Sequence, residues 1–426
     1  MARRLRKAMV GMRSGGVVLV AVAMLIGGCN PTAQPSIGST PPTSPSVAGS
    51  GQSASPIASA TTSPTPATSP RTATGLVTFP ASAVRSASVD AWTALGSRVF
   101  SFDGPKQTSA RRISMTDLAT GTSTFIAKTH AGHMVEAEAA TTDRIVWLET
   151  WRDHPGPPTT AVPGCVDVGK PLRWQIYAAE IATGVESVVA AGTDVRTAVG
   201  GECADVDRPL LAADGDRVAY TLEEPSKAHP LANQIVVRSL TDGVSIRTID
   251  TAGLAEDLRI SGQVVAYRDN VPPDPSVDTV DPFDGRLMLA LSDGQAPTRV
   301  DDHTSDVGLS AGRIAWTRTD ANDGSVWTEP LSASAPTKLT LVPVPGFKPD
   351  TATEISVADD AVAWTSNGTD DQDVGISRPA IWTTAGVGPG LLEGVELIDV
   401  MALGGGWLVW SSGGAHAIQV VAVGGY

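Results

Sequence analysis

Short apolar runs that end in an aromatic residue recur along the chain after residue 95. Each run follows a small or acidic turn, and we call its last position the aromatic marker. Six full copies end at Trp147, Tyr220, Tyr267, Trp316, Trp364 and Trp410, and a degenerate seventh copy, GSRVFSF, has Ser101 at the marker position. Successive markers are 46, 73, 47, 49, 48 and 46 residues apart. A nearly constant period of this length indicates a repeat architecture.

A polar turn ending in glycine follows the aromatic marker in most copies, and we call it the glycine turn. It ends at Gly121, Gly184, Gly243, Gly294 and Gly386, whereas the copy of Trp316 has LSAS (331–334) in its place. Apolar and polar positions alternate on both sides of the turn, which predicts a β-hairpin with glycine at positive φ. Each period therefore contains about four short strands, and no segment sustains the 3.6-residue period of a helix.

Four strands per repeat are typical of an all-β fold, the β-propeller. Counting the copies predicts seven blades, with six or eight as alternatives, over residues 75–426. The last copy has only three strands before Tyr426, so we expect residues 75–80 to close the last blade as its outer strand. Such closure protects strand edges that would otherwise pair with other chains. An open pair of β-sandwiches is the alternative fold.

The beginning of the chain has the pattern of an export signal. Residues 1–15 are basic and 17–26 are an unbroken apolar run, which is the order of a secretory signal peptide. The run is too short to span a membrane, which takes about 20 residues. Leu25-Ile26-Gly27-Gly28-Cys29 resembles the lipobox of bacterial lipoproteins. The resemblance implies cleavage after residue 28 and lipid on Cys29, which would anchor the chain on the extracytoplasmic side of the cell membrane.

Residues 29–74 are composed mainly of Ser, Thr, Pro, Ala and Gly, with Arg71 as the one charged side chain. Such a segment cannot bury enough apolar surface to offset the entropy of ordering it. We interpret it as a disordered tether that holds residues 75–426 away from the membrane.

The repeats resemble the WD40-like repeats of bacterial TolB-type propellers. Asp214-Gly215-Asp216-Arg217-Val218-Ala219-Tyr220 and the run from Ile176 to Gly184 match that pattern best. The Ser-Pro that often precedes Asp-Gly in those repeats is absent, and TolB itself has six blades. The resemblance implies an envelope protein that works by binding, without naming its partner.

Net charge narrows the classes of partner. The whole chain carries −14, and loss of the five basic residues within positions 1–13 changes this to −19. A net-acidic chain is a poor match for nucleic acid, whose phosphates call for a basic face. We therefore expect a monomer that binds an envelope protein or glycan, and no nucleic acid.

The longest interval between markers holds two insertions, and each contains a cysteine. Cys165 lies in the first and Cys203 in the second. In a four-stranded blade, the loop after the second strand and the loop between blades emerge on the same face. With Cys29 lipidated and the compartment oxidising, the pattern predicts a Cys165–Cys203 disulfide, with two free thiols as the alternative.

The same face carries the other long loops and all the histidines, so we expect it to be the binding surface. These histidines are His130, His133, His154, His229, His303 and His416. Asp274, Asp278, Asp281 and Asp284 could form a Ca²⁺ loop, but their spacing favours a solvated loop. No metal site and no cofactor are assigned.

Two motifs of common enzymes are absent: the sequence has no HExxH and no P-loop. The sequence therefore predicts a lipid-anchored, non-enzymatic binding module of the bacterial envelope. The alternative is a hydrolase, lyase or oxidoreductase with its site at the mouth of the central channel, for which Asp207, Asp257 and Asp306 are the candidate residues.

Overall fold

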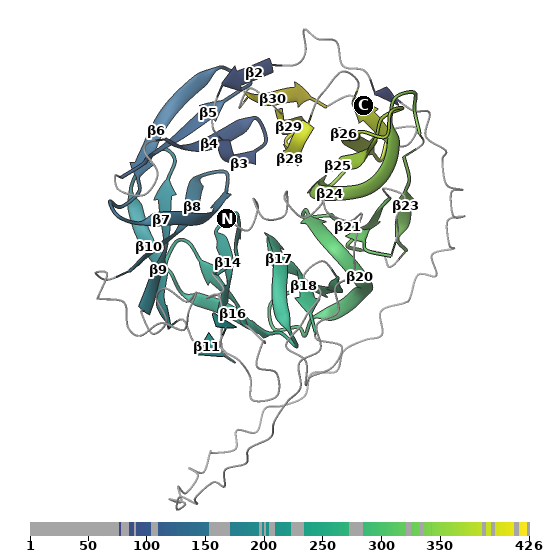
Figure 1. Cartoon of the computed structure of the whole chain (residues 1–426). Coiled ribbons are helices and arrows are strands. Elements are labelled where there is room, and N and C mark those ends of the chain that lie inside the picture. Colours follow the sequence, from purple (N-terminus) through teal and green to yellow (C-terminus); the bar gives the residue numbers. More distant parts are fainter. Residues whose placement is uncertain are drawn as a thin grey trace, which may run out of the picture. The chain divides into compact units, whose positions relative to one another are not determined.

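A computed structural model describes the fold of the repeat region (Figure 1). It describes residues 76–77, 85–88, 91–103, 110–152, 171–195, 198–199, 202–203, 209–222, 234–271, 284–320, 325–332, 335–341, 343–385, 389–392, 397–412 and 417–423. All of them lie in one compact unit, Pro66–Tyr426. The described residues form strands and no α-helix. None of them therefore belongs to a helix long and apolar enough to cross a membrane.

Three separate antiparallel sheets of four strands come first in the chain. The first consists of β3 (Ala91–Leu95), β4 (Arg98–Asp103), β5 (Arg112–Asp117) and β6 (Thr122–Lys128). The second consists of β7 (Met134–Ala140), β8 (Arg144–Arg152), β9 (Pro171–Glu180) and β10 (Glu186–Val195). The third consists of β13 (Leu211–Asp214), β14 (Arg217–Leu222), β15 (Gln234–Ser239) and β16 (Ser245–Asp250). A small hairpin, β11 (Ala198–Val199) and β12 (Glu202–Cys203), lies between the second and third sheets in the sequence.

A seven-stranded sheet follows, because one long strand belongs to two four-stranded units. It contains β17 (Leu254–Ser261), β18 (Val264–Asn270), β19 (Gly285–Ala290), β20 (Thr298–Leu309), β21 (Arg313–Arg318), β22 (Val326–Pro330) and β23 (Thr337–Leu339). The first half of β20 pairs with β19, with Thr298 opposite Leu289. Its second half pairs with β21, with Val307 opposite Trp316. Thus β20 is the last strand of one unit and the first strand of the next.

The two remaining sheets each contain a strand from the beginning of the repeat region. One sheet consists of β24 (Lys348–Ala358), β25 (Ala361–Thr369), β26 (Gly375–Thr383) and β27 (Gly390–Leu392). β1 (Leu76–Val77) joins this sheet and runs parallel to β27. The other sheet consists of β28 (Leu397–Gly404), β29 (Trp407–Ser412) and β30 (Ala417–Ala422). β2 (Arg85–Ser88) joins it and is antiparallel to β30. The prediction that residues 75–80 close the last sheet is therefore wrong: Arg85–Ser88 closes it. The last three-stranded group is indeed completed by a strand from the beginning of the repeat region. That strand is β2, because its connection to β3 is shorter than a connection from residues 75–80 to β3 would be.

The first strands of the successive units contact one another in a closed series. Contacts run from β3 to β7, β13, β17, β20, β24 and β28, and β28 contacts β3. Figure 1 shows the sheets following one another around a common centre in the order of the sequence. Antiparallel sheets of this size, arranged radially with their first strands innermost, define a β-propeller.

The aromatic markers form the core between neighbouring sheets. All six full markers lie on the second strand of a unit and are at most 2% exposed. Trp147, for example, packs with Phe100, Ile126 and Tyr177 between the first two sheets. The glycine turns also have the predicted backbone, since φ is positive at Gly121, Gly184, Gly243 and Gly294. Gly386 lies outside the described residues.

The two faces of the propeller differ in the length of their connections. In an antiparallel meander, the connections from strand one to two and from three to four lie at one face, here called the turn face. These connections are short, such as 96–97 and 118–121. The opposite face, here called the loop face, holds the connections from strand two to three and from one unit to the next. The longest of these are 153–170, 196–210, 223–233 and 271–284.

Candidate functional site

Most of the site residues named from the sequence lie outside the described residues. These are Cys29, Cys165, Asp207, Asp274, Asp278, Asp281, His154, His229 and His416. The predicted lipidation and the predicted Cys165–Cys203 disulfide therefore stay predictions. Cys203 is in the hairpin of β11 and β12, opposite Ala198. The fourth acid of the candidate Ca²⁺ loop, Asp284, faces the protein: its carboxylate accepts from Thr319 Oγ1 at 2.9 Å and lies 3.2 Å from His303 Nδ1.

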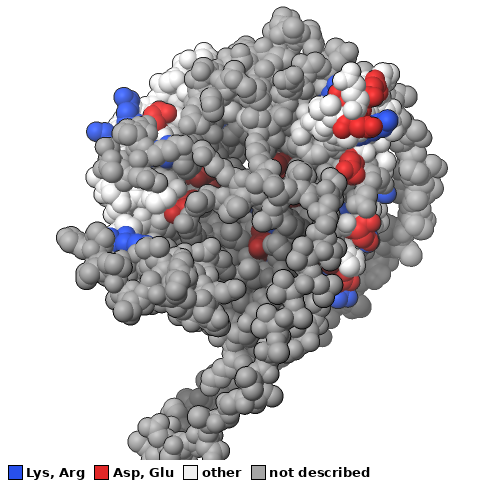
Figure 2. Space-filling view, in the orientation of Figure 1, with Lys and Arg blue, Asp and Glu red and all other residues white. Residues whose placement is uncertain are grey.

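The other two channel-mouth candidates, Asp257 and Asp306, lie on different strands among the described residues. Asp257 lies in β17 with a positive φ of 49°, and its Oδ2 is 3.2 Å from Nε of the buried Arg268. Asp306 lies in β20, where its backbone N–H donates to Thr317 Oγ1 at 3.1 Å. Figure 2 shows acidic side chains near the centre of the face in view, in keeping with the negative net charge.

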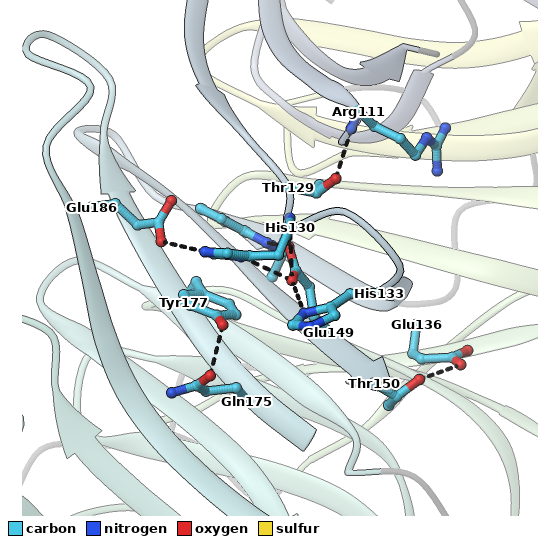
Figure 3. Close-up of polar contacts among 11 residues, drawn as sticks. Arg111, Thr129, His130, His133, Glu136, Glu149, Thr150, Gln175, Tyr177 and Glu186 are labelled. Atoms are coloured by element: carbon cyan, nitrogen blue, oxygen red, sulfur yellow. Dashed lines mark hydrogen bonds and ion pairs between the residues drawn. The ribbon is translucent and has the colours of Figure 1, made fainter. Parts of the chain in front are cut away.

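One group of convergent ionisable side chains stands out among the described residues (Figure 3). His130 and His133 lie in the loop between β6 and β7, and Glu149 lies near the loop-face end of β8. The three offer ligand atoms that all lie within 4.8 Å of one another. We call His130, His133 and Glu149 the histidine–glutamate cluster. It is located on the loop face, above the apolar core between the first two sheets.

Local backbone contacts fix the loop that carries both histidines. Thr129 directly follows β6 and makes two hydrogen bonds with Arg111: its backbone N–H donates to the Arg111 carbonyl at 2.9 Å, and its Oγ1 accepts from the Arg111 N–H at 2.8 Å. The His133 N–H then donates to the His130 carbonyl at 3.2 Å, closing a turn. Gly132 has φ of 82° within that turn, a conformation that glycine adopts without strain.

Glu149 is the centre of the cluster, and its side chain is fully buried. Its Oε1 accepts from the indole N–H of Trp147 at 2.8 Å and from the backbone N–H of His130 at 3.1 Å. Its Oε2 faces Nδ1 of His130 at 3.0 Å and Nδ1 of His133 at 2.8 Å. A buried carboxylate needs this many partners, because removal from water strongly disfavours an unpaired charge.

Aromatic rings hold both imidazoles in place. His133 stacks on Trp151 with 4.2 Å between the ring centroids and 4° between the planes. His130 stacks on Tyr177 at 4.6 Å, and Tyr177 in turn stacks on Trp147 at 5.5 Å. The two imidazoles differ in access, because the side chain of His130 is 42% exposed and that of His133 is 18% exposed. The cluster is thus rigid below and open to solvent at His130.

Two further ionisable groups border the cluster. The Glu186 carboxylate lies 3.6 Å from Nε2 of His130. Burial raises the pKa of Glu186, the charge of Glu149 adds to this, and His130 opposes it. Burial, with the charges of Glu149 and Glu186, raises the pKa of Tyr177 to about 12. The phenol of Tyr177 therefore stays protonated and donates to Gln175 Oε1 at 2.6 Å.

The sequence placed His130 and His133 on the correct face but did not single them out, and it did not select Glu149 at all. The available signal was a His-x-x-His spacing just before a first strand, with an acid two positions after the aromatic marker Trp147. Residues 133 and 149 are far apart in the sequence, and only the pairing of β7 with β8 brings their side chains together.

No protein-family model and no curated protein sequence matches the chain. Among solved structures, it is similar to the β-propeller domain of the Trilobed protease from Pyrococcus furiosus, with 8% identity over 75% of this chain and 88% of that chain and a TM-score of 0.44. It is also similar to a chain of the mitotic checkpoint complex, with 12% identity, coverage of 87% and 99%, and a TM-score of 0.45. Oligogalacturonate lyase in complex with manganese gives 12% identity, coverage of 66% and 73%, and a TM-score of 0.41. Similarities this low carry no argument about function.

Proposed function

We propose that the chain is a non-enzymatic binding module, displayed outside the bacterial membrane, that captures an envelope protein or glycan with its loop face. The difference between the two faces carries this proposal. The turn face consists of tight turns, whereas the loop face collects the long connections and the histidine–glutamate cluster. Loops held by a rigid scaffold are where binding residues concentrate.

The blade count in this proposal is seven. The closed series of contacts among seven first strands supports it, as does the double role of β20 in the seven-stranded sheet. The proposed closure by Arg85–Ser88 against β30 gives the last blade its fourth strand. It also covers an edge that could otherwise pair with another chain.

The sequence supports the proposal that the module is displayed at the membrane surface. We propose that lipid on Cys29 anchors the mature chain and that residues 29–74 form the tether. We also propose the Cys165–Cys203 disulfide, because the connection between β8 and β9 and the connection that holds β12 both belong to the loop face. On the chain-entropy model, a disulfide that closes the loop from Cys165 to Cys203 would contribute roughly 3–4 kcal/mol to the free energy of unfolding.

Site-specific photo-crosslinking in cells tests the binding face. A photoreactive amino acid is placed at Ala131, which is exposed on the loop face, and in a matched protein at Ala296, which is exposed on the turn face. We expect crosslinked products from Ala131 and few from Ala296, because only the loop face meets the partner. Digestion of the product with a protease or with glycan hydrolases tells a protein partner from a glycan.

Two outcomes would overturn the proposal. Absence of a product from Ala131 and from a second loop-face position, Gln372, would remove the loop face as a binding surface. Products from Ala296 alone would assign binding to the turn face instead.

A further inference from the structure

We propose that His130, His133 and Glu149 bind one divalent transition-metal ion of the Zn²⁺ class, through Nδ1 of each imidazole and Oε2 of the carboxylate. The inference goes beyond the proposed function, since a binding module captures its partner with or without an ion. Two imidazole nitrogens and one carboxylate oxygen are a ligand set that zinc uses widely in proteins.

The distances from the carboxylate oxygen to the two imidazole nitrogens suit such an ion. Oε2 of Glu149 is 3.0 Å from Nδ1 of His130 and 2.8 Å from Nδ1 of His133. With bonds of about 2.0–2.1 Å to the metal, neighbouring ligand atoms lie about 2.9 Å apart at a right angle and about 3.4 Å apart in a tetrahedron. The two distances from Oε2 to the imidazole nitrogens therefore need to lengthen by about half an ångström to reach tetrahedral spacing.

Groups of the kind that surround metal ligands lie next to each of the three side chains. Metal-binding histidines usually donate their second ring N–H to a carboxylate, and metal-binding carboxylates are themselves hydrogen-bonded. Here Nε2 of His130 faces the carboxylate of Glu186 at 3.6 Å. The second oxygen of Glu149, Oε1, accepts from Trp147 and from the His130 backbone. Stacking on Trp151 fixes the plane of His133.

Charge balance also favours a dication. The side chain of Glu149 is fully buried, and the carboxylate of Glu186 lies 3.6 Å from Nε2 of His130. Two carboxylates and two neutral imidazoles carry a total charge of −2, which one divalent ion cancels. The imidazole nitrogens select against Ca²⁺ and Mg²⁺, which prefer oxygen ligands.

The competing explanation is a proton on each Nδ1. Two neutral imidazoles would then donate to Oε2, and the cluster would serve only to hold the loop between β6 and β7. The two arrangements differ in what the protein binds, and a titration with metal separates them.

Zn²⁺ titration of the full chain, purified in detergent and stripped of metal with a chelator, is the test. We expect one tight site per chain by calorimetry. His133→Ala should weaken it at least 100-fold, and Glu186→Gln should weaken it about 10–100-fold, the usual effect of removing an outer partner. Co²⁺ in place of Zn²⁺ should give the intense visible absorption of a four-coordinate ion in the wild type and lose it in His133→Ala.

His303→Ala is the matched control, because His303 also has its Nδ1 beside a carboxylate, that of Asp284 at 3.2 Å. The Zn²⁺ affinity of the His303→Ala variant should equal that of the wild type. The proposal falls if the wild type binds no Zn²⁺, if His133→Ala binds as tightly as the wild type, or if His303→Ala loses affinity equally. Near-ultraviolet circular dichroism shows that each variant is folded. The titration contains no partner, so its failure is distinct from failure of the crosslinking experiment.

Discussion

The indole N–H of Trp147 donates to Oε1 of Glu149 at 2.8 Å, which joins a repeating core position to the candidate site. Of the other marker tryptophans, Trp316 donates to Asp301 Oδ2 at 2.9 Å. The indole N–H groups of Trp364 and Trp410 are buried without a hydrogen-bond partner among the described residues. The aromatic marker therefore serves packing in the six units that have a full copy, and in the second unit it also donates to a fully buried carboxylate.

Trp147→Phe should destabilise the protein more than Trp364→Phe. Both changes remove an indole from a fully buried position, but only the first removes a donor from the buried carboxylate of Glu149. We expect an extra loss of about 1–3 kcal/mol in the free energy of unfolding, the usual cost of leaving a buried polar group unsatisfied. Urea unfolding measures both variants. Equal losses would show that the indole bond contributes nothing to stability.

Gly184→Ala should cost more than Gly121→Ala. Both glycines have positive φ, 70° and 74°, so alanine is strained at either by about 1–2 kcal/mol. A Cβ at Gly184 would lie 2.5 Å from the carbonyl oxygen of Ile126 in the neighbouring sheet, whereas a Cβ at Gly121 meets nothing within 4 Å. Thermal unfolding should therefore show a clearly larger decrease in Tm for Gly184→Ala. Matching decreases would argue that the first two sheets are not held this closely.

Stability should depend on pH through Glu329, whose pKa is raised by burial from its usual 4.5. The folded protein then binds this proton more tightly than the unfolded chain does. The free energy of unfolding therefore gains a contribution as pH falls through the raised pKa, and loses it again as pH rises towards neutrality. Glu329→Gln should remove that contribution. Urea unfolding of both proteins between pH 7 and pH 4 gives the comparison, and parallel pH profiles would contradict the prediction.

Removal of residues up to 90 should harm the fold more than removal up to 83. The shorter truncation deletes β1, which has only two residues, whereas the longer one also deletes β2 and uncovers the edge of β30. An uncovered edge strand pairs readily with other chains. We expect a lower Tm and marked aggregation by light scattering only for the longer truncation. Equal behaviour of the two proteins would place the closing strand elsewhere.

Several features of the fold follow from the sequence because they depend on local chemistry. Alternation of apolar and polar residues and glycine at positive φ depend on short stretches within one repeat, and the period of the aromatic markers is read directly from the spacing of the repeats. They correctly indicate four-stranded units and a core of marker residues such as Trp410. The closing strand was misplaced, because residues 76–77 and 85–88 are both short segments with little to distinguish them.

The repeating sheet and its two kinds of face follow from the sequence, since strand order and turn length already separate long connections from tight turns. Folding brings His130 and His133 to Glu149. That meeting depends on the register of β7 against β8 and on the approach of β6 to β9, neither of which any local pattern encodes. The hydrogen-bond partners of a buried carboxylate come from the strands packed around it. Packing therefore determines these partners, and spacing along the chain does not.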